Sequence, residues 1–402
     1  MKFMSSISII NQIKYNPIIF KIVKILGEIA LSLLRLFIQT DDKLILFVCF
    51  GGRKYDDSPR CIYEAMLKDE RYDECKFVWA FIEPEKHVLL GRGVKIKIDT
   101  LKYFITCFRA RVWITNSAVT RGLSFKGKRT FYFNTWHGSA IKRLGNDMNI
   151  NSFGNFSKEK EKKTCLFDVF CAQSEYDINI FSSCFSIPKD CFEVIGLPRN
   201  DELVINNNES TITNIKNKLK IPLEKKVILY APTFREYDRD YGNNCVLVPP
   251  MNLEKWKKVL GGDYVLLFRA HYEVVKTMDI EDNTFIRNVS KYPNINELML
   301  ISDILLSDYS SIYFDYSILG RPMICWAYDF ELYNQKRGLY FDIRNVLGDT
   351  KVVTEDDVLD TILNEKGNRR EIISKAFRDE YVKSYGSASL QSLDIIYKKC
   401  YQ

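Results

Sequence analysis

The alternation of short apolar runs with helical segments is the feature that most constrains how this chain folds. From Lys43 onward, apolar runs alternate with stretches of helical character such as 58–68 and 101–109. Runs that are apolar on both faces and separated by helices are typical of buried parallel strands. The predicted strands are 44–50, 76–82, 94–98, 111–115, 130–134 and 167–172, followed by 226–231, 263–268, 303–307 and 322–326.

The strand pattern restarts after a polar stretch at 206–220, in a chain of 402 residues that exceeds the usual size of one core. We therefore predict an α/β protein with two doubly wound, Rossmann-type domains and a cleft between them. The expected division is an N-terminal helix within 1–42, a first domain over 43–205 and a second over 206–402. A closing helix, at about 368–401, is free to pack on either domain.

The N-terminal apolar stretch from Pro17 to Phe37 carries charges at Lys21, Lys24, Glu28 and Arg35. Spacings of three, four and seven place these charges on one stripe of a helix. A membrane-spanning helix needs about 20 nearly uncharged residues, so the pattern predicts an amphipathic helix instead. Two interpretations stay open: the helix lies in a membrane interface with its basic residues toward the headgroups, or it packs on the first domain.

Cysteine usage indicates the redox compartment of the protein, and the distribution of charge indicates which ligands it attracts. The eleven cysteines include no CxxC pair, which is typical of thiols in a reducing compartment and favours neither a disulfide framework nor a metal cluster. The segment 121–163 holds ten Lys or Arg against three acids, within a chain of net charge +7. Such a segment attracts phospholipid headgroups, nucleic acid or a phosphorylated substrate, although the run KEKEKK at 158–163 fits a solvated face better.

Polar clusters follow several predicted strands, at the edge of a parallel sheet where ligands usually bind. The segment NTWHG at 134–138 brings a histidine and a glycine close to Lys142 and Arg143, which suits a phosphate site with a titratable group. His271 also follows a strand. A single histidine in this position is more often structural, but two of the three histidines lie there, whereas His87 reads as a surface residue.

A third cluster runs from Ser307 to Tyr316, from a strand into a helix. Ser310 or Ser311 is expected to cap that helix, and hydroxyls with free amides at a helix start can also hold phosphate. Thr233 and Arg235 follow the first strand of the second domain.

These residues belong to a larger set of motifs with a shared order and spacing: WHGSAIKRLG (136–145), GLPRND (196–201), ILYAPTFRE (228–236), RAH (269–271) and SDYSSIYFDYSILGRPMICWAYDFELYNQKRGLYFD (307–342). From about residue 43 to 385 the chain resembles the CDP-glycerol:poly(glycerophosphate) glycerophosphotransferase family of teichoic acid synthesis. The resemblance implies a GT-B-like pair of domains, with the acceptor side in 43–205 and the CDP-linked donor bound by 206–402.

The family's two essential histidines match His137 and His271, its donor-phosphate region matches Ser310, Ser311 and Arg269, and its late motif matches Asp329 and Arg337-Gly338. The residues predicted to bind substrate are Gly138, Lys142, Arg143, Asn200, Thr233, Arg235, Arg269, Ser307, Asp308, Ser310, Ser311, Asp315, Asp329, Arg337 and Gly338. The family commonly has Thr-Pro where this chain has Ser139-Ala140, and proline where it has Tyr272. These departures bear on donor and acceptor choice.

The expected reaction transfers glycerol phosphate, or a related alditol phosphate, from CDP-glycerol to a hydroxyl of a lipid-linked teichoic acid or capsule-type polymer or primer, with release of CMP. His137 is the expected base and His271, with Arg269, the expected partner of the diphosphate, and the reverse assignment of the histidines stays open. No cofactor and no metal are expected. The triplet Asp238-Arg239-Asp240 resembles a metal-binding DxD but is interpreted as a loop.

The expected partners are CDP-glycerol or another CDP-alditol, a lipid-linked saccharide or polymer acceptor, and an anionic membrane surface at the cytoplasmic face, where the protein is peripheral. Nucleic acid is not expected, and a homo-oligomer is left open. Two alternatives remain: a GT-B glycosyltransferase that uses a nucleotide sugar, and a non-catalytic basic protein that binds membranes. The donor, the acceptor polymer and the number of additions are not determined by the sequence.

Overall fold

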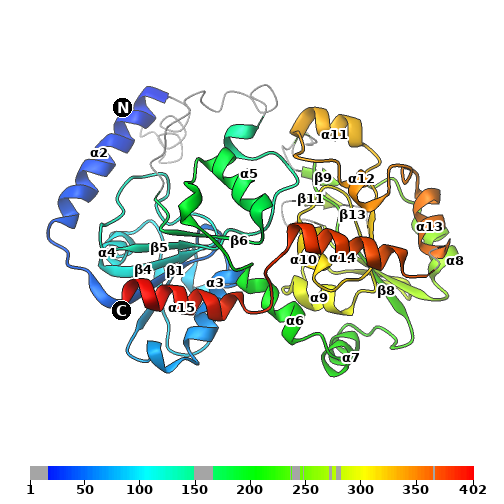
Figure 1. The fold of residues 1–402 in the computed structure, drawn as a ribbon, viewed down its shortest axis with the longest axis horizontal. Coiled ribbons are helices and arrows are strands. Elements are labelled where there is room, and N and C mark those ends of the chain that lie inside the picture. Colours follow the sequence, from blue (N-terminus) through cyan, green and yellow to red (C-terminus); the bar gives the residue numbers. More distant parts are fainter. Residues whose placement is uncertain are drawn as a thin grey trace, which may run out of the picture. The chain divides into compact units, whose positions relative to one another are not determined.

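A computed structural model describes residues 17–148, 166–235, 237, 245–247, 249–270, 274–277, 282–364 and 367–402. The chain divides into two compact units (Figure 1). Unit 1 comprises Met1–His137, Leu166–Phe170 and Ser389–Gln402, and unit 2 comprises Gly138–Cys165 and Cys171–Ala388. The division does not fall at the predicted boundary near residue 205. It passes directly after His137, and the last fourteen residues return to unit 1 because the C-terminal helix packs there.

The first sheet contains seven strands in the order β3-β2-β1-β4-β5-β6-β7, and its recorded pairings are parallel. Counted from β1, the order runs outward in one direction to β3 and then in the other through β4, which is the doubly wound arrangement. The chain passes into unit 2 within β6. The strands are β1 Asp41–Val48, β2 Lys76–Phe81, β3 Val94–Lys97, β4 Ala110–Thr115, β5 Phe131–Asn134, β6 Val169–Ala172 and β7 Phe192–Val194.

The helices of unit 1 are α2 Pro17–Arg35, α3 Asp57–Met66, α4 Leu101–Arg109 and α15 Ala388–Cys400, of which Ala388 is counted in unit 2. Leu31 of α2 joins a core with Leu46, Trp113 and Tyr132. The C-terminal helix is held by a hydrogen bond from Tyr72 to the carbonyl of Leu393. These contacts define a core in which a parallel sheet is buried between helices.

Unit 2 contains a five-stranded parallel sheet in the order β12-β10-β8-β13-β14, again doubly wound from its first strand, β8. Its strands are β8 Lys226–Tyr230, β10 Tyr264–Phe268, β12 Ile286–Asn288, β13 Ile304–Ser307 and β14 Met323–Cys325, and a separate pair joins β9 Cys245–Leu247 to β11 Val274–Thr277. Its helices are α5 Glu175–Phe185, α6 Glu202–Ile205, α7 Glu209–Lys218, α8 Leu253–Leu260, α9 Ile295–Ile301, α10 Ile312–Ser317, α11 Phe330–Arg337, α12 Ile343–Leu347, α13 Glu355–Asn364 and α14 Arg369–Tyr381.

The predicted α/β fold with parallel sheets is confirmed, and every predicted strand overlaps an observed one. The strands that the pattern missed are three or four residues long: β7, β9, β11 and β12. Such short segments carry too few apolar residues to stand out, as Ile286–Asn288 illustrates with its arginine and asparagine. The predicted closing helix is two helices, α14 in unit 2 and α15 in unit 1.

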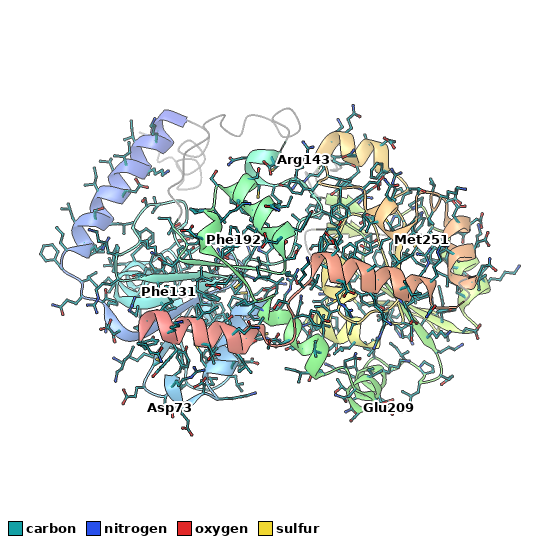
Figure 2. All side chains as sticks on the ribbon, viewed as in Figure 1. Asp73, Phe131, Arg143, Phe192, Glu209 and Met251 are labelled. Atoms are coloured by element: carbon teal, nitrogen blue, oxygen red, sulfur yellow. The ribbon has the colours of Figure 1, made fainter. Side chains whose placement is uncertain are left out.

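Helix α2 contacts unit 1 through a face that combines Leu31 with part of its charged stripe. Glu28 accepts a hydrogen bond from the backbone amide of Ser124 at 2.8 Å, and Arg35 donates to the carbonyl of Lys126 at 3.2 Å. The apolar side is exposed, with Leu26 at 60% and Leu33 at 57%. Side chains radiate outward along this helix in Figure 2. Among the helices that the structure describes, none is long and apolar enough to cross a membrane.

Candidate active site

The switch point of the first sheet, where the strand order reverses between β1 and β4, is built from backbone amides held by side chains. The amide of Phe50 donates to Asn116 Oδ1 at 2.8 Å, and the amide of Gly51 donates to Ser117 Oγ at 3.0 Å. Asn116 and Ser117 come directly after β4. This is the place where doubly wound sheets bind ligands, because the loops after the two strands diverge there.

His137 lies at this switch point and its tautomer follows from one hydrogen bond. Its Nδ1 is 2.7 Å from the backbone carbonyl oxygen of Asn116. A carbonyl oxygen can only accept, so Nδ1 carries the proton and Nε2 carries the lone pair of the neutral ring. The ring also stacks on Trp136, with 4.1 Å between centroids. The imidazole is therefore held in the orientation and the tautomer that a general base needs.

The backbone before His137 is held in a conformation that bulky residues rarely adopt. Trp136 has a φ of 53°, in the left-handed region, and its amide donates to Asn134 Oδ1 at 2.8 Å. Asn134 is itself fixed by a bond from its Nδ2 to the carbonyl of Ser117 at 2.9 Å. A left-handed tryptophan costs about 1–2 kcal/mol, and such strain persists where surrounding bonds enforce it, often at functional sites.

In unit 2, the backbone of Gly138 lies close to two side chains. Its φ is 133°, and a Cβ placed on it would lie 3.2 Å from Arg199 Nη2 and 3.2 Å from Ser311 Oγ. Only glycine fits this combination of backbone angle and close approach. The backbone after His137 thus lies against the hydroxyl of Ser311, although the two residues are far apart in the sequence.

A buried carboxylate holds the surroundings of Gly138 in place. Asp315 accepts from Arg199 Nη2 at 2.6 Å and from Asn200 Nδ2 at 2.7 Å. Both Asn200 and Asp315 are buried, at 0% and 6% exposure. Arg199 and Asn200 of the motif GLPRND are thus held by Asp315, and Arg199 lies next to the backbone of Gly138.

The switch point of the second sheet, between β8 and β13, contains a buried arginine bound by two carboxylates. Arg235 donates from Nη1 to Asp308 at 2.9 Å and from Nε and Nη2 to Asp329 at 2.7 and 2.9 Å. Asp308 also accepts from the amide of Thr233 at 2.8 Å, and Tyr309 donates to Asp329 at 2.9 Å. Burial alone would lower the pKa of Arg235, but Asp308 and then Asp329 raise it, so the guanidinium stays charged.

Residues 142–143, which follow Gly138, pair with residues 337–339 of the motif that contains Arg337-Gly338. Lys142 forms an antiparallel bridge with Leu339, the amide of Arg143 donates to the carbonyl of Gly338 at 3.0 Å, and Arg337 donates to the carbonyl of Arg143. Arg337 is buried, Lys142 is half-buried with its ammonium 5.7 Å from the ring centroid of Phe234, and Arg143 is exposed. Arg143 is labelled in Figure 2.

The predicted serines differ in what their hydroxyls do. Ser307 is fully buried and donates to the carbonyl of Ala231 at 2.6 Å. Ser310 caps the short helix α10 by accepting from the amide of Ile312 at 3.3 Å, whereas Ser311 forms no side-chain cap. Ser310 and Ser311 are both half-buried. Arg269 is half-buried too, and its Nη1 donates to the carbonyls of Val289 and Tyr292 at 3.1 and 2.7 Å.

Some predictions fall outside the described residues. His271 and the Asp238-Arg239-Asp240 triplet lie there, as does the basic run 158–163. Within the described part of the chain, no group of three or more His, Cys, Asp or Glu side chains is placed to hold a metal ion, and the cysteines form no disulfide. His87 stacks on Phe81, and burial lowers its pKa.

Sequence reasoning missed Asn116, which fixes the ring of His137, and gave no role to Asn134, which fixes the strained turn before it. Each stands at or directly after the end of a predicted strand, and that position was the available signal. Their importance depends on contacts between neighbouring strands, which the strand order decides.

Comparison with known proteins places the chain among envelope-polymer transferases. The sequence profile of CDP-Glycerol:Poly(glycerophosphate) glycerophosphotransferase matches residues 30–394. The chain is 33% identical over 327 residues to the teichoic acid glycerol-phosphate transferase of Staphylococcus aureus, covering 79% of this chain and 83% of that protein. It is 36% identical over 308 residues to the teichoic acid poly(glycerol phosphate) polymerase of Staphylococcus epidermidis, covering 75% of this chain and only 42% of the polymerase.

A solved structure agrees with these sequence matches. The wall teichoic acid polymerase TagF superposes with a TM-score of 0.80 at 31% identity, covering 95% of this chain and 98% of that one. A histidine variant of TagF has also been solved after soaking with CDPG.

Proposed function

The chain belongs to the CDP-Glycerol:Poly(glycerophosphate) glycerophosphotransferase family, and we propose that it transfers glycerol phosphate from CDP-glycerol to a hydroxyl of an envelope polymer or its lipid-linked primer. The acceptor is a teichoic acid or a capsule-type polymer, and CMP is the second product. A related alditol phosphate is the alternative group transferred. The proposal rests on family membership together with the geometry of one residue, His137.

The observation that carries the proposal is the hydrogen bond from His137 Nδ1 to the carbonyl of Asn116. It leaves Nε2 to take the proton of the acceptor hydroxyl as the oxygen attacks the phosphorus that bears glycerol. The bond from this phosphorus to the CMP oxygen breaks, and CMP leaves with the electron pair. Phosphoryl transfer depends mainly on positioning and charge neutralisation, so this chemistry needs an oriented base and cations at the phosphates.

We divide the predicted substrate residues into two groups by what their side chains already bind. The residues with half-buried or exposed polar ends are proposed to contact the donor phosphates or the acceptor: Lys142, Arg143, Arg269, Ser310 and Ser311. The residues whose side chains bond to other protein groups around a buried network are proposed to position the loops: Asn200, Arg235, Ser307, Asp308, Asp315, Asp329 and Arg337. Thr233 is proposed to do the same through its backbone amide, which donates to Asp308. Gly138 and Gly338 supply close backbone approaches. His271 remains the proposed partner of the departing CMP.

Two Rossmann-type domains of the GT-B kind fit this assignment of roles. The base would come from the first and the donor-phosphate contacts from the second, as the doubly wound order of each sheet supports. We propose that the acceptor binds to the domain over 43–205 and the CDP-linked donor to the domain over 206–402, as the motifs indicate.

Peripheral binding to the cytoplasmic face of a membrane completes the proposal. The exposed apolar side of α2, which includes Leu26, Leu33 and, beyond its end, Phe37 at 86% exposure, supports it. An apolar helical surface of this kind enters the interface between headgroups and acyl chains. The sequence leaves two interpretations open for this helix, binding in a membrane interface and packing on the first domain. Glu28 and Arg35 bond to unit 1 while Leu26 and Leu33 are exposed, so docking on the unit and exposure of an apolar side occur together.

The test of the function is release of CMP from CDP-glycerol in the presence of a lipid-linked glycerol-phosphate acceptor, with CDP-ribitol and UDP-sugars as competing donors. His137→Gln keeps the size and polarity of the side chain but removes the base, and turnover should fall by about a hundredfold or more. The matched control is His87→Gln, which should retain full turnover. Release of UDP but not of CMP would replace the proposal with a glycosyltransferase.

A further inference from the structure

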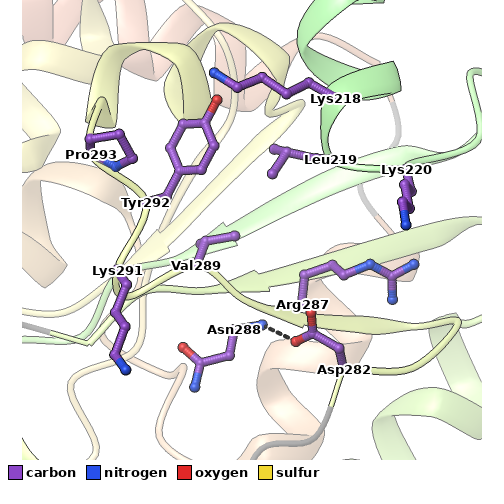
Figure 3. A pocket seen from close by; sticks show the side chains of 10 residues that line it. All are labelled: Lys218, Leu219, Lys220, Asp282, Arg287, Asn288, Val289, Lys291, Tyr292 and Pro293. Atoms are coloured by element: carbon purple, nitrogen blue, oxygen red, sulfur yellow. Dashed lines mark hydrogen bonds between the residues drawn. The ribbon is translucent and has the colours of Figure 1, made fainter.

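A basic pocket lies on unit 2, apart from the residues assigned to the donor and the base. It has a volume of about 460 Å³. It is lined by the end of α7 and the next residues, by one residue before β12, and by the segment from β12 onward: Lys218, Leu219, Lys220, Asp282, Arg287, Asn288, Val289, Lys291, Tyr292 and Pro293. Figure 3 shows these side chains around the pocket. Helix α7 begins at Glu209, which is labelled in Figure 2. The volume is in the range of small-molecule sites and exceeds what a single phosphate fills.

The charges of this pocket are unbalanced. Its lining contains four cations, Lys218, Lys220, Arg287 and Lys291, against one acid, Asp282. Lys218 is occupied, because it pairs with Glu297 at 3.1 Å and lies over the ring of Tyr292. Asp282 accepts from the amide of Asn288 at 2.8 Å.

The other three cations have no carboxylate partner among the described residues. Within the part of the chain that the structure describes, Arg287 donates to the neighbouring carbonyl of Ile286 at 3.2 Å, and neither Lys220 nor Lys291 forms an ion pair. In Figure 3 the charged ends of Lys220 and Arg287 lie at one side of the pocket and that of Lys291 lies at the other. Cations that come from separate segments and are spread along a pocket suit a ligand with several charges better than a single anion.

Lys220 occupies a backbone position that normally selects glycine. Helix α7 ends in a Schellman motif, with the amide of Ile221 bonded to the carbonyl of Lys216 at 2.9 Å and the amide of Lys220 bonded to that of Asn217 at 3.0 Å. The residue after the cap in this motif adopts the left-handed conformation, and Lys220 has a φ of 55°. A lysine there strains the backbone where glycine would not. This position therefore carries a backbone cost that glycine would avoid.

The pocket is connected to the donor site through backbone. The carbonyls of Val289 and Tyr292, both pocket residues, accept the hydrogen bonds of Arg269 Nη1. A ligand held against this segment thus lies next to the loop that positions a proposed donor-binding arginine.

We propose that this pocket binds successive phosphodiester groups of the anionic acceptor polymer and so acts as a polymer-holding subsite. The inference rests on the proposed function, since it names the acceptor as a poly(alditol phosphate) chain. Lys220, Arg287 and Lys291 each pair with a phosphodiester, and the pocket retains the product of one transfer while the next donor enters. The reacting hydroxyl is bound elsewhere, so a single glycerol-phosphate acceptor does not need the pocket.

The experiment measures binding of a synthetic oligo(glycerol phosphate) of several repeats to the full chain by calorimetry, without donor, at low and high salt. Lys220→Gly should weaken binding about threefold, because one exposed ion pair is lost, and should leave the Tm unchanged or higher, because the strain is relieved. Lys220→Gly with Arg287→Gln and Lys291→Gln should weaken it tenfold or more and flatten the salt dependence. Lys258→Ala, which removes an exposed lysine of α8, is the matched control and should bind as the unchanged chain does.

Activity separates this inference from the proposed function. CMP release with a single-repeat acceptor should be unaffected in Lys220→Gly, whereas polymer products should become shorter. Unchanged oligomer affinity in the triple variant would overturn the subsite, as would equal affinity for inorganic phosphate and the oligomer. Loss of binding to anionic vesicles with oligomer binding intact would identify the pocket as a membrane contact and overturn it too. A chain that binds the oligomer but releases no CMP from CDP-glycerol refutes the function and leaves the subsite.

Discussion

Replacing Arg235 with methionine tests whether this arginine supports the fold rather than the substrate. The guanidinium is 4% exposed and bonded to Asp308 and Asp329, and Asp308 itself is 1% exposed. Methionine keeps much of the apolar volume beside the stacked rings of Tyr309 and Tyr333 but removes the positive charge. The variant is left with a buried carboxylate that has lost its cation.

The expected cost follows from this uncompensated charge. Removing one partner of a buried ion pair typically lowers the free energy of unfolding by about 3–5 kcal/mol, which a domain of ordinary stability of about 5–15 kcal/mol survives. The cost should shrink as the pH falls, because the folded variant gains by protonating the stranded carboxylate more readily than the unfolded chain does. One such proton corresponds to at most about 1.4 kcal/mol per pH unit, which bounds how much of the cost is recovered.

Hydrogen exchange measured by mass spectrometry is the suitable assay, because it reports on unit 2 without assuming that the whole chain unfolds in one step. Strand β8 precedes the segment that carries Arg235, and β13 ends directly before Asp308. The amides of these two strands should exchange faster by the factor that corresponds to the lost free energy. Arg235→Met with Asp308→Asn should restore more than half of the protection. Lys218→Met, which breaks an ion pair with 59% and 29% exposed side chains, is the control and should cost less than 1 kcal/mol.

Two results would refute the reasoning. A loss below about 1 kcal/mol in Arg235→Met at pH 7.5 would mean that the carboxylates need no cation. A loss of the expected size that does not depend on pH, and that Asp308→Asn does not relieve, would mean that packing rather than charge is responsible. Either outcome would mean that Arg235 is again a candidate for binding the substrate.

Three further predictions concern the rest of the site and the membrane. Burial raises the pKa of Asp177 to about 6, so the contribution of this carboxyl group to stability is greatest below pH 3.8 and is lost as the pH rises to 6. Above pH 6, Asp177→Asn should therefore be more stable than the unchanged chain, by at most about 3 kcal/mol. Urea titrations should show this difference vanishing near pH 4. Gly138→Ala, whose Cβ would meet Ser311, should lower turnover with CDP-glycerol and cost about 1–3 kcal/mol, and full activity would remove the close approach from the argument. Leu26→Glu with Leu33→Glu should abolish sedimentation with anionic liposomes while Leu390→Glu, at 61% exposure on α15, should not, and equal sedimentation would contradict anchoring by α2.

The sequence alone was sufficient for features that depend on local pattern. Apolar runs between helices predicted the parallel sheets, because a strand buried on both faces must be apolar throughout. The same pattern placed His137 and Gly138 at a strand end, and the charges of α2 on one stripe. Each of these inferences uses residues within a few positions of one another, where chain geometry fixes the spacing.

Only the tertiary structure decided what the polar side chains bind. Arg235, Asp308 and Asp329 look like substrate ligands in the sequence. Their bonds, however, join residues 73 and 94 positions apart and depend on the strand order β8-β13-β14. The tautomer of His137 depends on the carbonyl of Asn116, which lies on the loop of a neighbouring strand. The stripe of charges on α2 predicted amphipathicity but not direction, because whether the charged or the apolar side faces the protein is set by the partner surface at 124–126. Partners of this kind are chosen by packing between distant segments, and no local pattern encodes them.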